Sequence, residues 1–218
     1  MTNQDFLHPT PFIDSDNESV REFSRAAGAY AKDDKSRAIA LYYAVRDQVI
    51  YDPYLDYNDR GVFQASAVLA VKRGFCVGKS ALLAACARAA GIPARTGFAD
   101  VRNHLTSKRL RELTQSDTFY WHSYTELLIE GAWVKCTPAF DRMLCERAKI
   151  APLEFDGMTD SLFHPFDPAG RRHMEYLRDR GTFADVPVDA IMEDFRLHYA
   201  RLMESGRAEG NFQAEVTT

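Results

Sequence analysis

The sequence lacks the features that mark several large classes of protein. Its four cysteines form no C-x-x-C pair, and neither they nor the six histidines fall at the usual spacings of zinc ligands. No apolar run is long enough to cross a membrane, and the start, MTNQDFLHPTPF, shows no basic segment followed by an apolar one, as a signal peptide would. No basic block stands out among 27 basic and 31 acidic residues. We therefore expect a cytoplasmic protein with free thiols, no metal, and neither a membrane nor a nucleic-acid partner.

What the sequence does contain is an ordinary globular composition. Of its 218 residues, 46% are hydrophobic and 27% are charged, and the formal net charge is −4. We find no internal repeat and no low-complexity linker. A chain of this length can bury one substantial core, so we predict a single domain over residues 1–218.

Helical patterns fill the first 90 residues. We expect helices over about 16–28, 33–52, 65–74 and 76–90. The first has its N-cap near Ser15 or Asp16. In the last of them Gly91 is the expected left-handed residue after the final turn, and Pro93 prevents continuation. The N-terminal half is therefore predicted to be helical.

Strand patterns follow. Residues 94–105, 119–130 and 132–140 are rich in aromatic and β-branched residues, and Glu130–Gly131 is a plausible tight hairpin turn. The pattern then weakens. We expect a charged surface loop at 164–176, a helix over about 187–204 with Pro187 in its first turn, and a frayed segment at 209–218. Helices followed by an antiparallel sheet predict an α+β fold.

The stretch RGFCVGKSALLAACARAAGIPAR, residues 73–95, places a cysteine at the mouth of a helix. Cys76 is a poor N-cap, but the helix dipole stabilises a thiolate there. Cys76 is therefore our candidate nucleophile, with an inert buried thiol as the alternative. Lys79, in the first turn, could aid thiolate formation, although a solvated side chain is the commoner role for such a lysine.

A cysteine nucleophile needs a base, and His122 lies on a predicted strand. If Glu130 and Gly131 form the turn, paired residue numbers sum to 261 and His122 faces Ala139. Thr137 and Asp141 then flank His122 diagonally on the same face. Glu126 shares that face but lies about 13 Å along the strand, too far to orient the imidazole. Asp141 is therefore the carboxylate we choose.

These residues carry a resemblance to the transglutaminase-like superfamily of papain-fold cysteine enzymes, over about residues 36–141. The family shows Gly-x-Cys at a helix start, an RAxGIPAR helix exit, a strand His, and Trp-x-x-x-Asp-Pro on the next strand. The matching positions, in order, are Gly74, Cys76, Arg88, Gly91–Ile92–Pro93–Ala94–Arg95, His122, Gly131 and Trp133–Val134. The resemblance implies a papain-like core in which a helical N-terminal half packs on an antiparallel sheet.

The sequence departs from the family pattern at two places. Ser123–Tyr124 replace the usual Ala–Trp after the histidine, and Thr137–Pro138 replace the Asp–Pro. A threonine can accept the imidazole N–H but supplies no charge to stabilise imidazolium. Asp141 could substitute for the missing carboxylate, and Thr137 alone or an incomplete triad are the alternatives.

The resemblance implies acyl transfer without a cofactor. Cys76 would attack an amide or peptide bond of a peptide, a protein or a small amide, and His122 would act as base and then as acid. The backbone N–H of Cys76 is the natural first oxyanion donor. The second donor stays open among Tyr51, Tyr57 and Gln64.

Two other functions remain possible from the sequence. The same fold could be an inactive module that binds proteins or peptides, which the missing Asp–Pro favours. Alternatively, the thiol could take an acyl group from a thioester such as an acyl-coenzyme A. Hydrolysis and transamidation share one acyl-enzyme, so the sequence does not separate them, nor does it set the oligomeric state.

Overall fold

The computed structural model describes residues 2–103, 106–163 and 174–216. Its longer helices and strands are α1 (Glu18–Ala27), α2 (Asp34–Gln48), α3 (Ala65–Val71), α4 (Cys76–Ala89), α5 (Lys108–Thr114), α6 (Arg142–Ala148), α7 (Val188–His198), β3 (Ala94–Asn103), β4 (Thr118–Ile129), β5 (Ala132–Cys136) and β6 (Met174–Phe183). The short ones are η1 (Asn3–Leu7), η2 (Arg60–Phe63), β1 (Ile50–Tyr51), β2 (Arg73–Gly74), α8 (Ala200–Glu204) and α9 (Phe212–Glu215).

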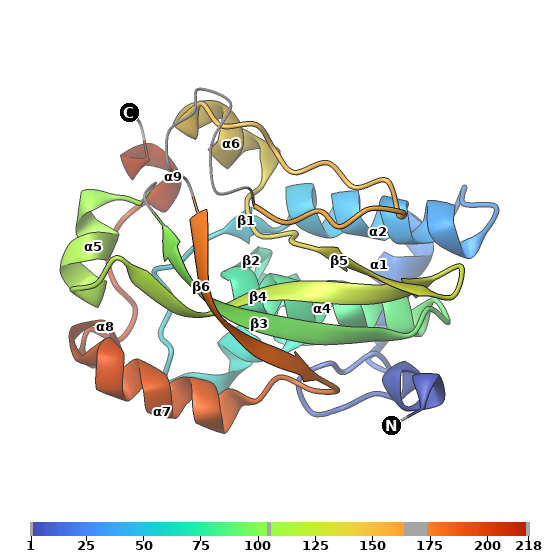
Figure 1. Ribbon diagram of the computed structural model, residues 1–218, viewed down its shortest axis with the longest axis horizontal. Coiled ribbons are helices and arrows are strands. Elements are labelled where there is room, and N and C mark those ends of the chain that lie inside the picture. The colour runs from blue at the N-terminus through green and yellow to red at the C-terminus, as the bar shows by residue number, and fades with distance from the viewer. Residues whose placement is uncertain (1, 104–105, 164–173, 217–218) are drawn as a thin grey trace.

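A four-stranded antiparallel sheet in the order β5-β4-β3-β6 covers one side of α4 (Figure 1). Helices α1, α2 and α3 pack around α4 as well. Every residue of α4 from Cys76 to Arg88 is buried, including the polar Lys79, Ser80 and Arg88. This is the α+β arrangement expected from the sequence, with α4 at its centre.

The helices begin and end close to the predicted places, with two shorter C-terminal ends. Helix α2 stops at Gln48 because Ile50–Tyr51 leave the helix and pair in parallel with Arg73–Gly74. The same pairing ends α3 at Val71. Gly91 has φ +82°, as predicted for the residue that closes α4.

The hairpin between β4 and β5 confirms the predicted register. Glu130 and Gly131 have φ +51° and +84°, which are the two left-handed residues of a type I′ turn. Thr125 faces Cys136 and Ile129 faces Ala132, so the paired numbers sum to 261.

The β4–β5 ladder ends at Cys136, earlier than predicted. Pro138, the next residue that would donate to β4, has no N–H. The N–H of Thr137 donates to the carbonyl of Ser161 at 3.0 Å, on the edge of β5 that faces away from β4. His122 and Ala139 are therefore not ladder partners. Asp141 leaves the sheet and caps α6, so its expected place beside His122 on a continuing strand is not formed.

Among the longer elements, α5, α6 and β6 were not expected. Helices α5 and α6 are short, and β6 has one buried residue, so none shows a strong pattern of apolar and polar residues. Residues 211–216 do not follow the frayed end predicted for 209–218. Phe212 packs against Tyr51, with ring centres 5.5 Å apart, and is 4% exposed. Within the predicted surface loop, residues 174–176 belong to β6, and 164–173 lie outside the described residues.

The described helices give no sign of a membrane span. None of them combines the length and the apolar character needed to cross a bilayer.

Candidate active site

Cys76 is the first residue of α4, and the preceding Phe75 has no side chain that could cap the helix. The first N–H groups of the helix therefore face the thiol. The nearby backbone N–H groups of Ser123, Val77 and Cys76 favour the ionised form of the thiol and so lower its pKa. Helix α4 packs against β4, the strand that carries His122 and Ser123.

The first turn of α4 is held in place by close packing. A Cβ at Gly78 would lie 2.5 Å from the carbonyl oxygen of Val62, and a Cβ at Gly74 would lie 2.9 Å from Cγ1 of Val68. Only glycine fits at both positions without movement of η2 or α3. The two glycines that flank Cys76 in the sequence therefore fix where its thiol lies.

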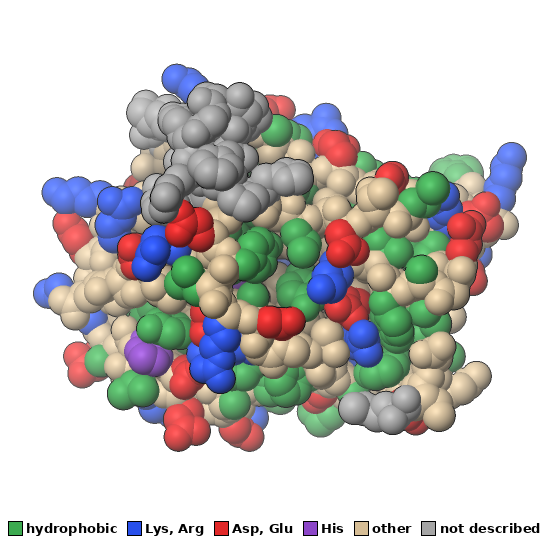
Figure 2. All heavy atoms as spheres, in the orientation of Figure 1, with side chains coloured by type: hydrophobic (Ala, Val, Ile, Leu, Met, Phe, Trp, Pro, Cys, Tyr) green, Lys and Arg blue, Asp and Glu red, His purple; other side chains and the backbone are tan. Residues whose placement is uncertain are grey.

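Cys76 and His122 line the same cavity. Its volume is about 50 Å³, which is enough for a few water molecules. The described lining is mostly aromatic and aliphatic: Tyr51, Pro53, Tyr57, Phe75, Val101, Asn103, Leu110, Thr114, Phe119, Tyr120, Phe140, Met174, Phe195, Tyr199 and Leu202. Figure 2 shows hydrophobic side chains gathered near the middle of the face seen there, with acidic and basic side chains around them.

Burial raises the pKa of the Cys76 thiol to about 11, against the opposing effect of the three backbone N–H groups. The helix N-terminus therefore does not by itself produce the thiolate expected from the sequence, because the loss of solvation is larger. Burial also raises the pKa of Cys145, to about 12, and that of Cys86. Of these three thiols, Cys76 keeps the pKa nearest to its ordinary value.

Asp141 has a complete set of partners away from His122. Its Oδ2 accepts from the Tyr51 N–H at 2.9 Å, and its Oδ1 accepts from the Leu144 N–H at 3.0 Å. The side-chain amide of Gln213 lies 3.1 and 2.9 Å from the two oxygens. These contacts use the acceptor sites of the carboxylate and tie β1, α6 and α9 together.

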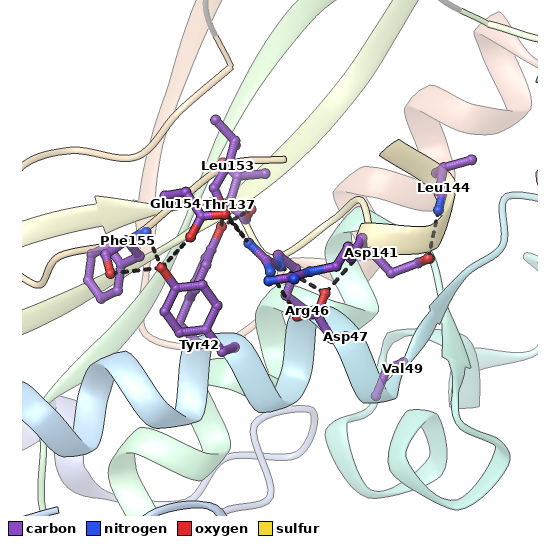
Figure 3. Close-up of polar contacts among 12 residues, drawn as sticks. Tyr42, Arg46, Asp47, Val49, Thr137, Asp141, Leu144, Leu153, Glu154 and Phe155 are labelled. Carbon is purple, nitrogen blue, oxygen red and sulfur yellow. Dashed lines mark hydrogen bonds and ion pairs between the residues drawn. The ribbon is translucent and has the colours of Figure 1, made fainter. Parts of the chain in front are cut away.

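The backbone of Thr137 is held by a hydrogen bond from α2. Figure 3 shows Thr137 beside Tyr42 and Arg46 of that helix. The Tyr42 hydroxyl donates to the Thr137 carbonyl at 3.2 Å and to the Leu153 carbonyl at 2.9 Å. Arg46 also reaches Leu153, at 2.6 Å. The Thr137 hydroxyl is buried and makes no hydrogen bond with any described residue.

Of the three candidates for the second oxyanion donor, two line the cavity and one does not. Tyr51 and Tyr57 line the cavity, although the Tyr57 hydroxyl donates to the Pro53 carbonyl at 2.9 Å. Gln64 does not line the cavity, and its amide lies 3.2 Å from the carboxylate of Asp14. The N–H of Cys76 is at the helix mouth, as predicted.

Two charged residues named in the sequence have other partners. Glu126 pairs with Arg95 at 2.6 Å, in keeping with its exclusion as the orienting residue. Lys79 is not solvated: it is fully buried, and its Nζ donates to the carbonyls of Arg46 and Val49 at 2.9 and 2.5 Å. The expectation of a surface lysine was wrong because the end of α2 packs over this turn of α4.

Tyr199 lines the cavity, although no motif in the sequence marks it as a site residue. In the sequence, Tyr199 belongs to the apolar stripe of the helix predicted over about 187–204. In the structure, its hydroxyl accepts from the Tyr120 N–H at 2.7 Å. The break between α7 and α8 at this residue places it there. In the part of the chain that the structure describes, no group of three or more His, Cys, Asp or Glu side chains could hold a metal ion.

Comparison with known proteins agrees with this architecture. A family model described as the transglutaminase-like superfamily matches residues 21–138. A crystal structure from Cytophaga hutchinsonii, of a candidate cysteine protease, is similar with a TM-score of 0.51 and 19% sequence identity. The match covers 85% of this chain and 48% of that one, so this chain spans about half its length. No curated protein gave a match.

Proposed function

Because the chain belongs to the transglutaminase-like superfamily, we propose that it is a cysteine-dependent enzyme that transfers an acyl group from an amide or peptide bond through a thioester. One observation carries this proposal: Cys76, at the mouth of a buried helix that packs on β4, shares a cavity with His122 of that strand. The substrate would be a peptide, a protein or a small amide.

The raised pKa of Cys76 decides how the reaction begins. The thiol is protonated in the resting site, so His122 takes its proton as the sulfur attacks the carbonyl carbon. The C–N bond then breaks, His122 returns the proton to the leaving amine, and a thioester remains. Water or an acceptor amine attacks the thioester, with His122 as base, and the thiol is released. The N–H of Cys76 would stabilise the oxyanion.

For the residue that orients His122, the contacts favour Thr137 over Asp141. Asp141 would have to give up a hydrogen bond from Tyr51, Leu144 or Gln213 to accept one from the imidazole. Thr137 stands where the family has its aspartate, and its buried hydroxyl has capacity left within the described residues. We therefore assign Asp141 a structural role and Thr137 the orienting role.

The test is the rate of iodoacetamide labelling at each cysteine as a function of pH, read by mass spectrometry in native protein and in His122→Ala. We expect Cys76 to label faster than the fully buried Cys86 and Cys136, and to lose roughly tenfold in rate near neutral pH when His122 is removed. If Cys76 labels no faster than these two and His122→Ala changes nothing, the enzyme proposal fails. The inactive binding module, favoured by the high thiol pKa, would then replace it.

The same assay separates the two orienting candidates. Thr137→Val should slow the His122-dependent labelling, and Thr137→Asp should speed it by supplying the charge found in the family. Asp141→Asn should lower stability and leave the pH profile of Cys76 unchanged. A changed profile in Asp141→Asn with an unchanged one in Thr137→Val would reverse the assignment.

A further inference from the structure

Four side chains from four different elements meet at the backbone that precedes His122. They are Asp100 of β3, Trp121 of β4, Arg180 of β6 and Asp194 of α7. None of them lines the cavity that Cys76 and His122 share, among its described lining residues. Asp100, Arg180 and Asp194 all contact Trp121, the neighbour of His122 in the chain.

The backbone at Trp121 is in an unusual conformation. Ala99 faces His122 but Val101 faces Phe119, so two residues of β4, 120 and 121, stand opposite Asp100 alone in a β-bulge. Trp121 has φ +60°, a left-handed conformation that bulky residues rarely adopt. Such strain persists only where surrounding contacts enforce it, and here it sets the direction in which the chain enters His122.

Side chains take over the hydrogen bonds that the bulge removes from the sheet. The N–H of Tyr120 donates to the Tyr199 hydroxyl at 2.7 Å, and the N–H of Trp121 donates to Oδ1 of Asp100 at 3.2 Å. The indole N–H of Trp121 donates to Oδ2 of Asp194 at 2.8 Å. Both carboxylates therefore hold Trp121, one through its backbone and the other through its ring.

Arg180 links these two carboxylates. Its Nε donates to Oδ1 of Asp100 and its Nη1 lies by Oδ2 of Asp194, both at 2.6 Å. Its guanidinium carbon lies 4.4 Å from the ring centre of Trp121, a cation–π contact. Phe98 faces Gly181 and Ala99 faces Asp179, so Arg180 is itself the extra residue of a bulge in β6, which points it at this cluster.

We propose that Arg180 is a positioning residue. By joining Asp100 to Asp194 and covering the indole, it holds Trp121 in the left-handed conformation and so fixes the imidazole of His122 in the cavity shared with Cys76. The inference rests on the proposed function only for the role of His122 as acid and base.

The molecule contains a matched control in the same sheet. Arg95 pairs with Glu126 at 2.6 Å, and its guanidinium carbon lies 4.2 Å from the ring centre of Trp133. Both pairs are largely buried, and both join an arginine to an acid and a tryptophan. Arg95 lies in a regular part of the β3–β4 ladder, four residue pairs from His122. Its loss should therefore cost stability without moving His122.

The experiment compares Arg180→Met and Arg95→Met, with native protein and His122→Ala, by the pH profile of iodoacetamide labelling at Cys76. We expect Arg180→Met to lower the His122-dependent rate by roughly ten- to hundredfold, since a small displacement of a reacting group has effects of this size. Arg180→Lys should recover only part of the rate, because an ammonium cannot reach both carboxylates as a fork. Arg95→Met should keep the native profile.

Each outcome decides a different question. A native profile in a folded Arg180→Met, beside a changed one in His122→Ala, overturns the role of Arg180 and leaves the proposed function intact. Equal losses in Arg180→Met and Arg95→Met also overturn it, since they indicate general destabilisation. No effect of His122→Ala overturns both proposals. If Arg180→Met lacks a cooperative unfolding transition, Asp194→Asn and Arg180→Lys decide by the same comparison.

Discussion

The two ends of α4 each carry one buried cation, and the two are used differently. Arg88, in the last turn, donates to the carbonyls of His8, Ala94 and Ala184 at 2.7, 3.0 and 2.5 Å. Lys79, in the first turn, donates to two carbonyls at the end of α2. A cation is favoured at a helix C-terminus and disfavoured at an N-terminus, so Arg88 suits its own helix and Lys79 does not.

The pKa values follow this difference. Burial lowers the pKa of Arg88 to about 10 and that of Lys79 to about 7, while Asp185 acts in the opposite direction on Arg88 and Asp141 does so on Lys79. Arg88 therefore stays charged at neutral pH, whereas Lys79 changes its charge there. The C-terminal end of α4 is a permanent clamp on three segments. At the N-terminal end, which carries Cys76, the contact of Lys79 depends on pH.

Removing the permanent clamp should have the largest effect. Arg88→Met leaves three buried or partly buried carbonyls without their donor, and we expect a loss of roughly 3 kcal/mol or more in the free energy of unfolding. Urea denaturation followed by circular dichroism measures it. A loss below about 1 kcal/mol would show that water or the backbone replaces the guanidinium, and the contrast between the two ends would disappear.

The effect of Lys79 should depend on pH. Its pKa in the folded protein, about 7, lies below its ordinary value of 10.5, so between these values the unfolded chain binds more protons. The stability of native protein should therefore rise with pH across this window, by at most about 1.4 kcal/mol per pH unit, and the contribution of Lys79 should level off below pH 7. Lys79→Met removes this rise.

The measurement is the difference in unfolding free energy between native protein and Lys79→Met at several pH values, which cancels other titrating groups. Arg88→Met is the control up to about pH 9, because Arg88, with a pKa of about 10, keeps its proton there and its difference from native protein should be constant. A constant difference for Lys79→Met as well would mean that Lys79 keeps its proton when buried.

Local patterns were enough to predict α4 and the hairpin. Gly91 and Pro93 mark the end of the helix, and Glu130–Gly131 fix the register of β4 on β5. The strand expected to carry Asp141 ends early, because Pro138 cannot donate to β4 and the ladder stops at Cys136. Ser161, 25 residues along the chain, binds the other edge of β5. No residue near Asp141 in the sequence predicts that Ser161 binds this edge of β5.

The same limit explains the errors around the site. The role of Lys79 depends on carbonyls of α2, about 30 residues earlier, and that of Arg180 depends on three other elements. A mostly exposed strand such as β6 has little hydrophobic alternation to announce it. Cys76 and His122, which line one cavity, could be proposed from the sequence because a short motif carries each of them, whereas the residues around them come from distant parts of the chain.

The smallest expected effect comes from substituting one glycine by alanine at either end of α4, Gly78 in the first turn or Gly91 after the last. In Gly91→Ala the new Cβ meets open space, so the cost is the left-handed conformation alone, about 1 kcal/mol. In Gly78→Ala the Cβ would press on the carbonyl of Val62, and overpacking of about 1–3 kcal/mol is partly offset by the better helix propensity of alanine. We expect the two variants to differ by about 1 kcal/mol or less in stability.

Function should distinguish them more sharply than stability does. The shift forced by Gly78→Ala moves the first turn of α4, and with it the thiol of Cys76, so labelling at Cys76 should change while Gly91→Ala keeps the native rate. Thermal denaturation and iodoacetamide labelling of both variants, side by side, provide the two measurements. Equal labelling rates would mean that η2 gives way at Val62 and leaves the first turn of α4, with the thiol of Cys76, in its native place.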